Sequence, residues 1–445
     1  MILGAILLFF SPPEGLSVAG YRIILIVVTT LMMIITEPIS LPAIAIYILV
    51  MEVVLGIGGP EEISHSFMND AVFFIMGSLM LAVAIIQQGW DKRIALGIIT
   101  LTGHKTKNIV FGFTAISAIM ASFIGGHTVA ALMLPIGLTL IRYTSEDKEK
   151  VRGLSAVLLF AIAYGALIGS VGTPSGGGRN VIMISYLKGY GISLPYLSWI
   201  IRLYPLVLIQ IPLVTWLLLK SFTSEYSSLD TGVRKLIVQV AKSPDLTGRS
   251  TVAVFIFFLV FCGWVFLSDS LGLGTIALAG VLLYLIAGFV KWEDLSRNTN
   301  WGVIILFGAT ISLGSNIKST GAALWMANHV VNYFESIMDI FPSITDSIIV
   351  LITTLLANVL SSSATVAVLG PVTMNLGPDT LHLGLVTVVA SAFGYFTAVA
   401  APACTIIYSS GLVSAKDFLK IGWKVGIMSI ILLVAYSNTY WLFFK

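Results

Sequence analysis

The chain has 445 residues, of which 57% are hydrophobic and only 10% are charged, and its formal net charge is +3. Soluble domains carry about 25% charged residues, so this composition excludes an ordinary soluble protein and predicts an all-α polytopic membrane protein. The apolar runs are continuous and do not alternate with polar residues, which excludes a transmembrane β-barrel. No spacing typical of a catalytic, zinc-binding or nucleic-acid-binding site stands out, and no cofactor is expected.

Apolar segments recur along the whole chain. A full crossing of the bilayer needs about 20 apolar residues. About eleven spans are predicted, and the first is interpreted as a span rather than a removed signal peptide. They are residues 1–11, 21–36, 41–57, 70–88, 154–187, 196–219, 251–267, 273–290, 301–318, 384–410 and 421–443.

Two further apolar segments, 107–141 and 344–376, are each broken near the middle by small polar residues. Residues 128–132 read Thr-Val-Ala-Ala-Leu and residues 365–369 read Thr-Val-Ala-Val-Leu, and a cluster of Gly or Ser precedes each. Gly and Ser favour bends and local backbone hydrogen bonds, so they interrupt a helix. Two interrupted segments at matching places predict a transporter binding site. We predict two re-entrant hairpins in an inverted-topology repeat, with ordinary pairs of packed helices as the alternative.

The basic residues favour one topology. With a cytoplasmic N-terminus and two re-entrant hairpins, 18 Lys and Arg lie inside and 5 outside, which agrees with the positive-inside rule. The first hairpin then enters from the cytoplasmic side and the second from the outer side. The predicted organisation is scaffold helices in 1–69, a first repeat in 70–220, a cytoplasmic linker in 221–249, further scaffold helices in 250–300 and a second repeat in 301–445.

Acidic residues are absent from the middle of both broken segments and of spans 154–187 and 384–410. A proton relay built on carboxylates normally leaves an intramembrane acid. A cation site here would therefore use backbone carbonyls and the oxygens of Ser, Thr or Asn, which suit sodium. We therefore predict sodium coupling rather than proton coupling.

Residues 172–180, Gly-Thr-Pro-Ser-Gly-Gly-Gly-Arg-Asn, must unwind the span that contains them, because they hold a proline and three consecutive glycines. Arg179 is costly in lipid, so it either binds an anion or snorkels near a boundary. His127, at the first hairpin tip, is either a structural hydrogen-bonder or a substrate contact. The counterpart of this stretch is residues 401–405, Ala-Pro-Ala-Cys-Thr, which is also broken by a proline.

The chain resembles the divalent anion/sodium symporters, the family of dicarboxylate and citrate carriers within the ion transporter superfamily. The resemblance covers nearly the whole chain and includes residues 12–16 (Pro-Pro-Glu-Gly-Leu), 35–42 (Ile-Thr-Glu-Pro-Ile-Ser-Leu-Pro) and 93–96 (Arg-Ile-Ala-Leu). The family carries Ser-Asn-Thr at each hairpin tip, ten residues before a proline. Counting back from Pro371 places this motif on residues 361–363, and both tip asparagines of the family are missing here.

The register of the first tip has two solutions. Counting back from Pro135 places the motif on residues 125–127, whereas matching the repeated Thr-Val-Ala shifts it by one residue. The family's unwound Thr-Pro-x-Gly-Thr-Pro-Pro-Asn maps onto residues 173–180. Only Thr173, Pro174, Gly176 and Asn180 match it.

The resemblance implies two groups of site residues, and His127 and Arg179 are additions to the family's motifs that could rebuild an anion site of different shape. Substrate contacts are expected at Gly126, His127, Thr128, Arg179, Ser362, Ser363, Thr365 and Pro402. Sodium ligands are expected at Ser122, Gly125, Gly126, Gly172, Thr173, Gly176, Asn180, Asn358, Ser361, Ser363, Ala401 and Cys404.

The predicted function is sodium-coupled uptake of a small divalent anion, a dicarboxylate, across the cell membrane. The resemblance implies a homodimer with a fixed scaffold and a moving transport domain, that is, an elevator-type mechanism. The alternatives are a sodium-independent anion exchanger, a proton-coupled carrier and an oxyanion efflux permease of the same superfamily. An intramembrane enzyme is more remote, since the sequence offers neither a convincing nucleophile–base pair nor metal ligands at depth. A passive channel is also more remote, because the inverted broken repeat favours alternating access.

Overall fold

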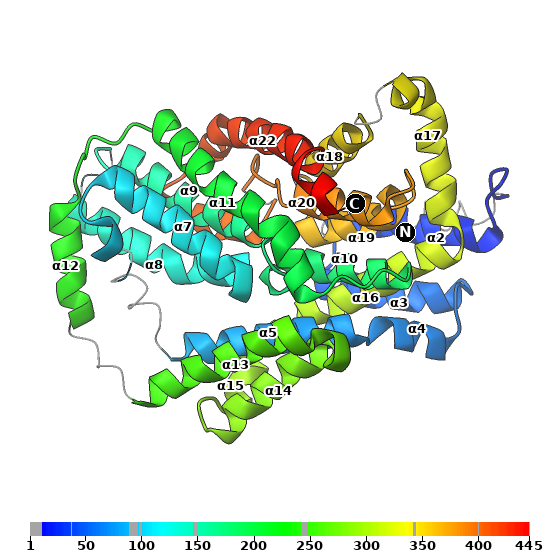
Figure 1. Ribbon diagram of the computed structural model, residues 1–445, viewed down its shortest axis with the longest axis horizontal. Helices are drawn as coiled ribbons and strands as arrows, with labels where there is room; N and C mark the ends of the chain where they lie inside the picture. The colour runs from blue at the N-terminus through cyan, green and yellow to red at the C-terminus, as the bar shows by residue number, and fades with distance from the viewer. Residues whose placement is uncertain are drawn as a thin grey trace.

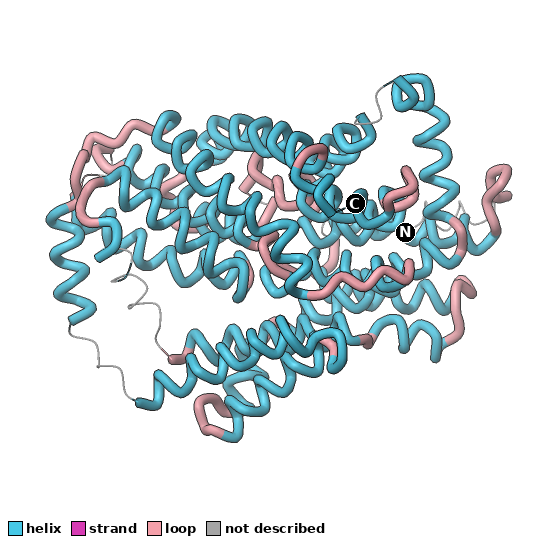
Figure 2. Tube along the Cα trace, viewed as in Figure 1, coloured by secondary structure: helices cyan, strands magenta, loops and turns pink. Residues whose placement is uncertain are grey.

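The computed structural model describes residues 11–36, 38–88, 97, 100–145, 147, 149–241, 248–340, 344–398 and 400–444. Within these ranges the regular structure is helical and contains no β-strand (Figure 2). The predicted all-α class is therefore confirmed. Residues 1–10 of the first predicted span, Glu37 and the segment 93–96 lie outside the described residues.

The helices of the first half follow the predicted spans closely (Figure 1). They are α2 (Val18–Thr36), α3 (Leu41–Val54), α4 (Pro60–Phe67), α5 (Asp70–Ile86), α7 (Thr106–Ile124), α8 (Gly126–Thr144), α9 (Arg152–Gly169), the 3-10 turn η1 (Pro174–Gly176), α10 (Gly178–Gly189) and α11 (Tyr196–Ser221). The predicted span 154–187 is thus two helices, α9 and α10, with an unwound stretch between them.

The second half begins inside the predicted linker 221–249, which contains α12. Its elements are α12 (Asp230–Ala241), α13 (Gly248–Leu271), α14 (Leu273–Ile286), α15 (Trp292–Asn298), α16 (Trp301–Ser319), α17 (Ala322–Ile340), α18 (Ile344–Ala357), α19 (Ser362–Thr373), α20 (Thr380–Ala390), α21 (Pro402–Tyr408), α22 (Ala415–Ser437) and the 3-10 turn η2 (Tyr440–Phe444). The predicted span 384–410 is likewise divided, into α20 and α21.

Six stretches of helix in the described residues are long and apolar enough to cross a membrane. They are Thr106–Ile124, Arg152–Gly169, Tyr196–Ser221, Thr251–Leu271, Trp301–Ser319 and Ala415–Phe444. A seventh crossing is possible where α4 and α5, bent by 42°, act as one span, and six shorter apolar helices accompany them. The chain is a multi-pass membrane protein.

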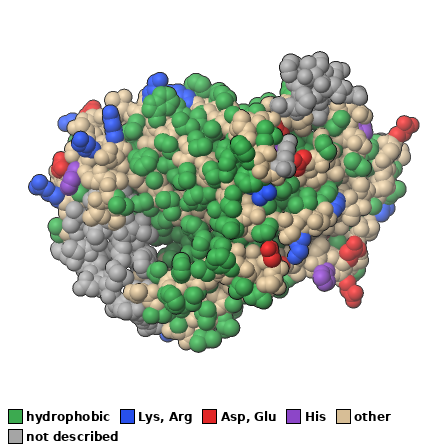
Figure 3. Space-filling view, viewed as in Figure 1, with side chains coloured by type: hydrophobic (Ala, Val, Ile, Leu, Met, Phe, Trp, Pro, Cys, Tyr) green, Lys and Arg blue, Asp and Glu red, His purple; other side chains and the backbone are tan. Residues whose placement is uncertain are grey.

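The buried apolar residues form two clusters. The smaller joins α2, α3, α16 and α17, and includes Ile23, Ile44 and Leu313. The larger extends through α5, through α7 to α14 and through α18 to α22. In Figure 3, hydrophobic side chains spread across the middle of the viewed face, and most charged side chains lie toward its left and right sides. This pattern suits a lipid-facing belt between two aqueous surfaces.

The linker lies against the base of the first broken segment. The N–H of Thr106 donates to the Ser227 carbonyl at 3.0 Å, and the N–H of Leu229 donates to the His104 carbonyl at 2.9 Å. Helix α12 packs against α8 at the same end, on the left of Figure 1. The start of α7 and the linker therefore occupy one side of the molecule.

Candidate functional site

Both predicted breaks occur as sharp turns between paired helices. Gly125 separates α7 from α8, with φ +82°, a left-handed conformation that glycine adopts without steric cost. Residues 358–361 separate α18 from α19. Each pair packs side by side, α7 on α8 and α18 on α19. The small polar residues therefore end one helix and start the next, as predicted.

The helix starts decide the register that the sequence left open. The Gly125 carbonyl accepts the N–H of Val129 at 3.2 Å, and the Ser361 carbonyl accepts the N–H of Thr365 at 2.9 Å. Gly125 and Ser361 are thus the matching caps, and Val129, not Thr128, corresponds to Thr365. The register counted from the prolines is the one adopted.

The first hairpin tip is attached to the unwound stretch between α9 and α10. The Ser122 hydroxyl donates to the Gly169 carbonyl at 2.8 Å. The Ser122 carbonyl accepts the hydroxyl of Thr173, and the Ser175 hydroxyl lies 3.4 Å from the same oxygen. Tyr196 supports the stretch from α11, since its hydroxyl lies 2.8 Å from Oγ of Ser175. These contacts connect the first hairpin, the unwound stretch and α11.

Asn180, at the start of α10, closes this stretch. Its Nδ2 donates to the carbonyls of Ser170 at 2.7 Å and Thr173 at 2.8 Å. Its Oδ1 is buried and has no hydrogen-bond partner. A buried amide oxygen without a donor is uncommon in folded proteins and is available to a cation. The second half has Cys404 at this place, with Sγ 3.9 Å from the Gly394 carbonyl.

The second hairpin repeats these contacts with different side chains. Nδ2 of Asn358 donates to the Phe393 carbonyl at 2.9 Å, as the Ser122 hydroxyl does to Gly169. The Asn358 carbonyl accepts the Thr397 hydroxyl at 3.2 Å, the counterpart of the bond from Thr173. Oδ1 of Asn358 also accepts a backbone N–H, from Phe396 at 2.8 Å.

Residues that make equivalent contacts in the two unwound stretches are always separated by the same number of residues along the chain. Helices α10 and α21 begin at matching residues, since the Asn180 N–H bonds to the Gly177 carbonyl at 3.0 Å and the Cys404 N–H bonds to the Ala401 carbonyl at 2.9 Å. The Ser170 carbonyl contacts Asn180 and the Gly394 carbonyl contacts Cys404. Ser170 and Gly394 are separated along the chain by the same number of residues as Asn180 and Cys404. The chain therefore contains an internal structural repeat.

The two repeats are packed crosswise. Helix α10, after the first unwound stretch, packs against α19 of the second hairpin. Helix α21, after the second stretch, packs against α8 of the first hairpin. This exchange brings both tips and both unwound stretches into one region, which explains why residues from positions 122–180 and 358–405 form one candidate site.

Arg179 is buried, with 6% of its surface exposed. Its guanidinium donates through Nη2 to the Ser170 hydroxyl, and its Nε is buried without a partner. None of the ion pairs among the described residues includes it. Arg179 is therefore a buried cation that forms an ion pair with no carboxylate among the described residues.

The other predicted site residues differ in how much of their surface is exposed to solvent. Ser362, Thr128 and Thr365 are buried, and the Thr365 hydroxyl donates to the Ser361 carbonyl at 3.1 Å. His127 is exposed in the first turn of α8, and Pro402 is exposed in the first turn of α21. Gly126 lies close to α9, because a Cβ there would be 3.2 Å from the Ala166 carbonyl.

One cavity, of about 90 Å³, lies beside this region rather than within it. Its walls come from α4, α10, α16, α19 and the turn between α4 and α5, and include Ser66, Tyr186 and Lys318. None of the residues predicted to bind substrate or sodium lines it. The sequence also did not identify Ser170, which holds both Arg179 and Asn180, because a lone serine in an apolar span carries no distinctive pattern.

The family model described as "Sodium:sulfate symporter transmembrane region" matches residues 1–445. The sodium-dependent dicarboxylate transporter SdcS of Staphylococcus saprophyticus is 27% identical over 472 residues, which cover 98% of this chain and 89% of the relative. Its namesake in Staphylococcus aureus strain USA300 is 27% identical over 473 residues, covering 98% and 90%.

Two solved structures share the fold at low sequence identity. The YdaH transporter of Alcanivorax borkumensis has a TM-score of 0.55 and 10% identity, over 86% of this chain and 87% of its own. MtrF of Neisseria gonorrhoeae, described as one of a class of antimetabolite efflux pumps, has a TM-score of 0.55 and 10% identity, over 98% and 96%. Both are similar to this chain in fold alone.

Proposed function

The chain belongs to the sodium:sulfate symporter family, and from this premise we propose that it takes up a small divalent anion, a dicarboxylate, together with sodium. The similarity to relatives named sodium-dependent dicarboxylate transporters supports the proposal. The observation that carries it is the crosswise packing of two broken repeats, which gathers two helix starts, a buried cation and a free amide oxygen. Helix starts offer unpaired N–H groups to anions.

In this proposal the guanidinium of Arg179 binds the anion. Desolvating an arginine without a partner costs several kcal/mol, so an occupied site would supply the missing negative charge. A guanidinium suits a carboxylate because its planar fork can donate two parallel hydrogen bonds. The tips beginning at Gly126 and Ser362 would hold the other end of the substrate, with Thr128, Ser363, Thr365 and Pro402 around it. His127 would be the contact whose charge varies with pH.

Sodium would bind where each tip meets its unwound stretch. In the first half, Oδ1 of Asn180 is the side-chain ligand, joined by backbone carbonyls near Ser122, Gly125, Gly172 and Gly176. In the second half, the backbone oxygens around Asn358, Ser361 and Ala401 replace it, since Cys404 provides no amide. Neutral oxygens on irregular backbone are the usual ligands for sodium in such transporters.

The transport cycle would be of the elevator type, with both hairpins moving as one body against a scaffold that includes α2 to α4 and α13 to α15. We propose a homodimer in the cell membrane with a cytoplasmic N-terminus. The domain limits expected from the sequence, with the linker at 221–249, belong to this proposal. No chemical step is assigned to the protein.

Uptake into proteoliposomes tests the function. The purified chain should accumulate labelled succinate at least tenfold faster with an inward sodium gradient than with an equal potassium gradient, and a sodium ionophore should abolish the difference. Citrate and sulfate in parallel assays define the preferred anion. Uptake that is independent of the sodium gradient but driven by an imposed proton gradient would refute sodium coupling.

A further inference from the structure

Glu52 lies on α3 with none of its surface exposed. Its two oxygens contact two side chains of α16: Oε1 accepts Nδ2 of Asn316 at 2.9 Å, and Oε2 lies 2.7 Å from Oγ of Ser312. No ion pair joins it to any other described residue. A buried carboxylate beside neutral groups alone carries a desolvation cost of several kcal/mol when it is ionised.

The hydrogen bonds continue from Glu52 to the end of α4. Oγ of Ser312 lies 2.7 Å from Oγ of Ser66, and Oγ of Ser66 lies 2.9 Å from the Ile63 carbonyl. These three contacts, from Glu52 to Ser312, from Ser312 to Ser66 and from Ser66 to Ile63, need three hydrogens. The two serine hydroxyls provide two of them. When Ser312 donates to an ionised Glu52 and Ser66 donates to Ser312, the Ile63 carbonyl has no side-chain donor; when Glu52 carries a proton and donates it to Ser312, all three contacts have a hydrogen.

Ser66 also lines the cavity of about 90 Å³ described above. Hydroxyls, one amide and an ammonium group share its walls, from Asn69, Ser185, Tyr186, Tyr190, Ser315 and Lys318. A water molecule occupies about 30 Å³ of liquid, and a polar site of this size has room and partners for water. The chain of contacts therefore runs from a buried acid to a polar space between α4, α10, α16 and α19.

We propose that Glu52 is a proton-binding site that exchanges its proton with this cavity through Ser312 and Ser66. In one exchange, Oε2 passes its proton to Oγ of Ser312, the Ser312 proton passes to Ser66, and the Ser66 proton passes to water. The products are a carboxylate at Glu52 and one protonated water, so the charges balance. Afterwards Ser312 donates to Glu52, Ser66 donates to Ser312, and the Ile63 carbonyl loses its side-chain donor.

The position of α16 connects this proton to transport, a step that rests on the proposed function. The Tyr186 hydroxyl on α10 contacts the Thr310 carbonyl of α16 at 3.0 Å and the Ala367 carbonyl of α19 at 3.1 Å. The two partners of Glu52, Ser312 and Asn316, therefore lie on the same helix, α16, as the Thr310 carbonyl that Tyr186 contacts. The protonated acid holds α3, α4 and α16 as they are seen here, and uptake falls as rising pH removes the proton.

Helices α3 and α16, and the helices packed against them, carry other titratable or charged groups. They include Tyr21 and Arg22 on α2, Tyr47 on α3, Glu61, Glu62 and His65 on α4, Tyr186 on α10 and Lys318 on α16. Arg22 donates to the Leu55 carbonyl at 2.8 Å, and Lys318 donates to the Gly189 carbonyl and lies over the Tyr190 ring. Both nearby cations therefore have partners other than Glu52.

Infrared difference spectroscopy of the reconstituted protein tests the site without using transport. Raising the pH should remove a carbonyl band of a protonated carboxylic acid, and Glu52→Gln should lack that band. Gln keeps an acceptor for Asn316 and a donor for Ser312, so this variant should fold. Glu62→Gln, which changes an exposed acid of α4, is the matched control and should retain the band.

A separate measurement tests the proton exchange through Ser312 and Ser66. In Ser66→Ala the acid band should persist, but its shift after transfer into D2O should be at least tenfold slower. Sodium-driven uptake should decline with pH more steeply in the wild type than in Glu52→Gln over the same range. If the acid band is absent at every pH at which the protein stays folded, or survives in Glu52→Gln, the proton site is refuted, whether or not the protein transports a dicarboxylate.

Discussion

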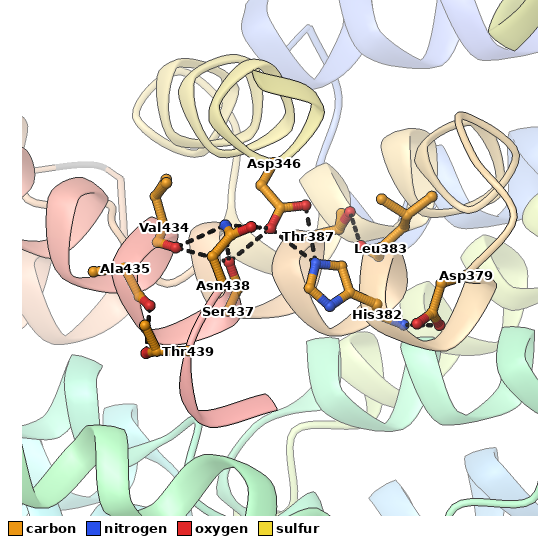
Figure 4. Close-up of polar contacts among 10 residues, drawn as sticks. All are labelled: Asp346, Asp379, His382, Leu383, Thr387, Val434, Ala435, Ser437, Asn438 and Thr439. Carbon is orange, nitrogen blue, oxygen red and sulfur yellow. Dashed lines mark hydrogen bonds and ion pairs between the residues drawn. The ribbon is translucent and has the colours of Figure 1, made fainter. Parts of the chain in front are cut away.

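His382 on α20 contacts Asp346 in the first turn of α18, with Nε2 of the imidazole 2.8 Å from Oδ2 of the carboxylate (Figure 4). The same Oδ2 accepts the Ser437 hydroxyl at 2.6 Å and Nδ2 of Asn438 at 3.1 Å. Trp441 covers the imidazole edge-on, with ring centroids 5.4 Å apart. One buried carboxylate thus joins α18, α20 and the end of α22, and fixes the base of the second broken segment.

Replacing Asp346 by Ala should destabilise the protein by about 3 kcal/mol, because three donors lose a buried, charged acceptor. The apparent melting temperature in detergent measures the loss. The matched control is Asp147→Ala, since Asp147 is exposed and pairs only with Lys150 at 3.9 Å among the ion pairs described; this change should cost less than about 1 kcal/mol. Equal effects of the two substitutions would show that the buried cluster is not a stabilising feature.

Arg179→Lys should raise the half-saturating anion concentration about tenfold, or roughly 1.4 kcal/mol, because lysine keeps the charge but loses the planar fork. Arg179→Ala should raise the half-saturating anion concentration further, while the protein still inserts into the membrane and folds. Arg202→Lys provides the control, since Arg202 is partly exposed and donates to the Ser198 carbonyl at 3.3 Å. If Arg179→Ala leaves the half-saturating anion concentration unchanged, Arg179 does not bind the anion, and the hairpin tips alone must bind it.

Asn180→Ala should raise the half-saturating sodium concentration about tenfold, roughly 1.4 kcal/mol, because it removes the free Oδ1. The substitution also removes two hydrogen bonds, so the melting temperature must be measured with and without sodium. A sodium ligand predicts that the stabilisation by sodium disappears, whereas a structural residue predicts equal losses in both conditions. Asn108→Ala, an exposed asparagine bonded to the Thr102 carbonyl at 3.2 Å, should retain the sodium effect.

The base of the first broken segment should face the cytoplasm. Cysteines placed at Gly103, Thr144 and Ser228, in a background without Cys262 and Cys404, should react with an impermeant maleimide only after the cells are permeabilised. Ser228 is included because it forms a bridge with Lys105 at the start of α7. Gly191, after α10, should react in intact cells. Labelling of Gly103 or Thr144 from outside would reverse the proposed orientation.

The positions at which helices break follow from local chemistry, and so the sequence predicted them. Gly125 adopts a left-handed conformation that other residues avoid, and Pro174 and Pro402 each begin a new helical turn after an unwound stretch. The apolar runs likewise predicted α5, α11, α13 and α16 to within a few residues. Burial in lipid requires every backbone group to be satisfied within its own segment, which makes such spans readable from composition.

The sequence by itself thus determined the helical membrane class, the two broken segments and the residue types near them. Only the tertiary structure decided the register in which Gly125 matches Ser361, the free oxygen of Asn180, the absence of an ion pair between Arg179 and any described carboxylate, and the burial of Glu52. Each depends on contacts between segments far apart in the chain, and the spacing of residues along one helix carries no information about which neighbour that helix meets.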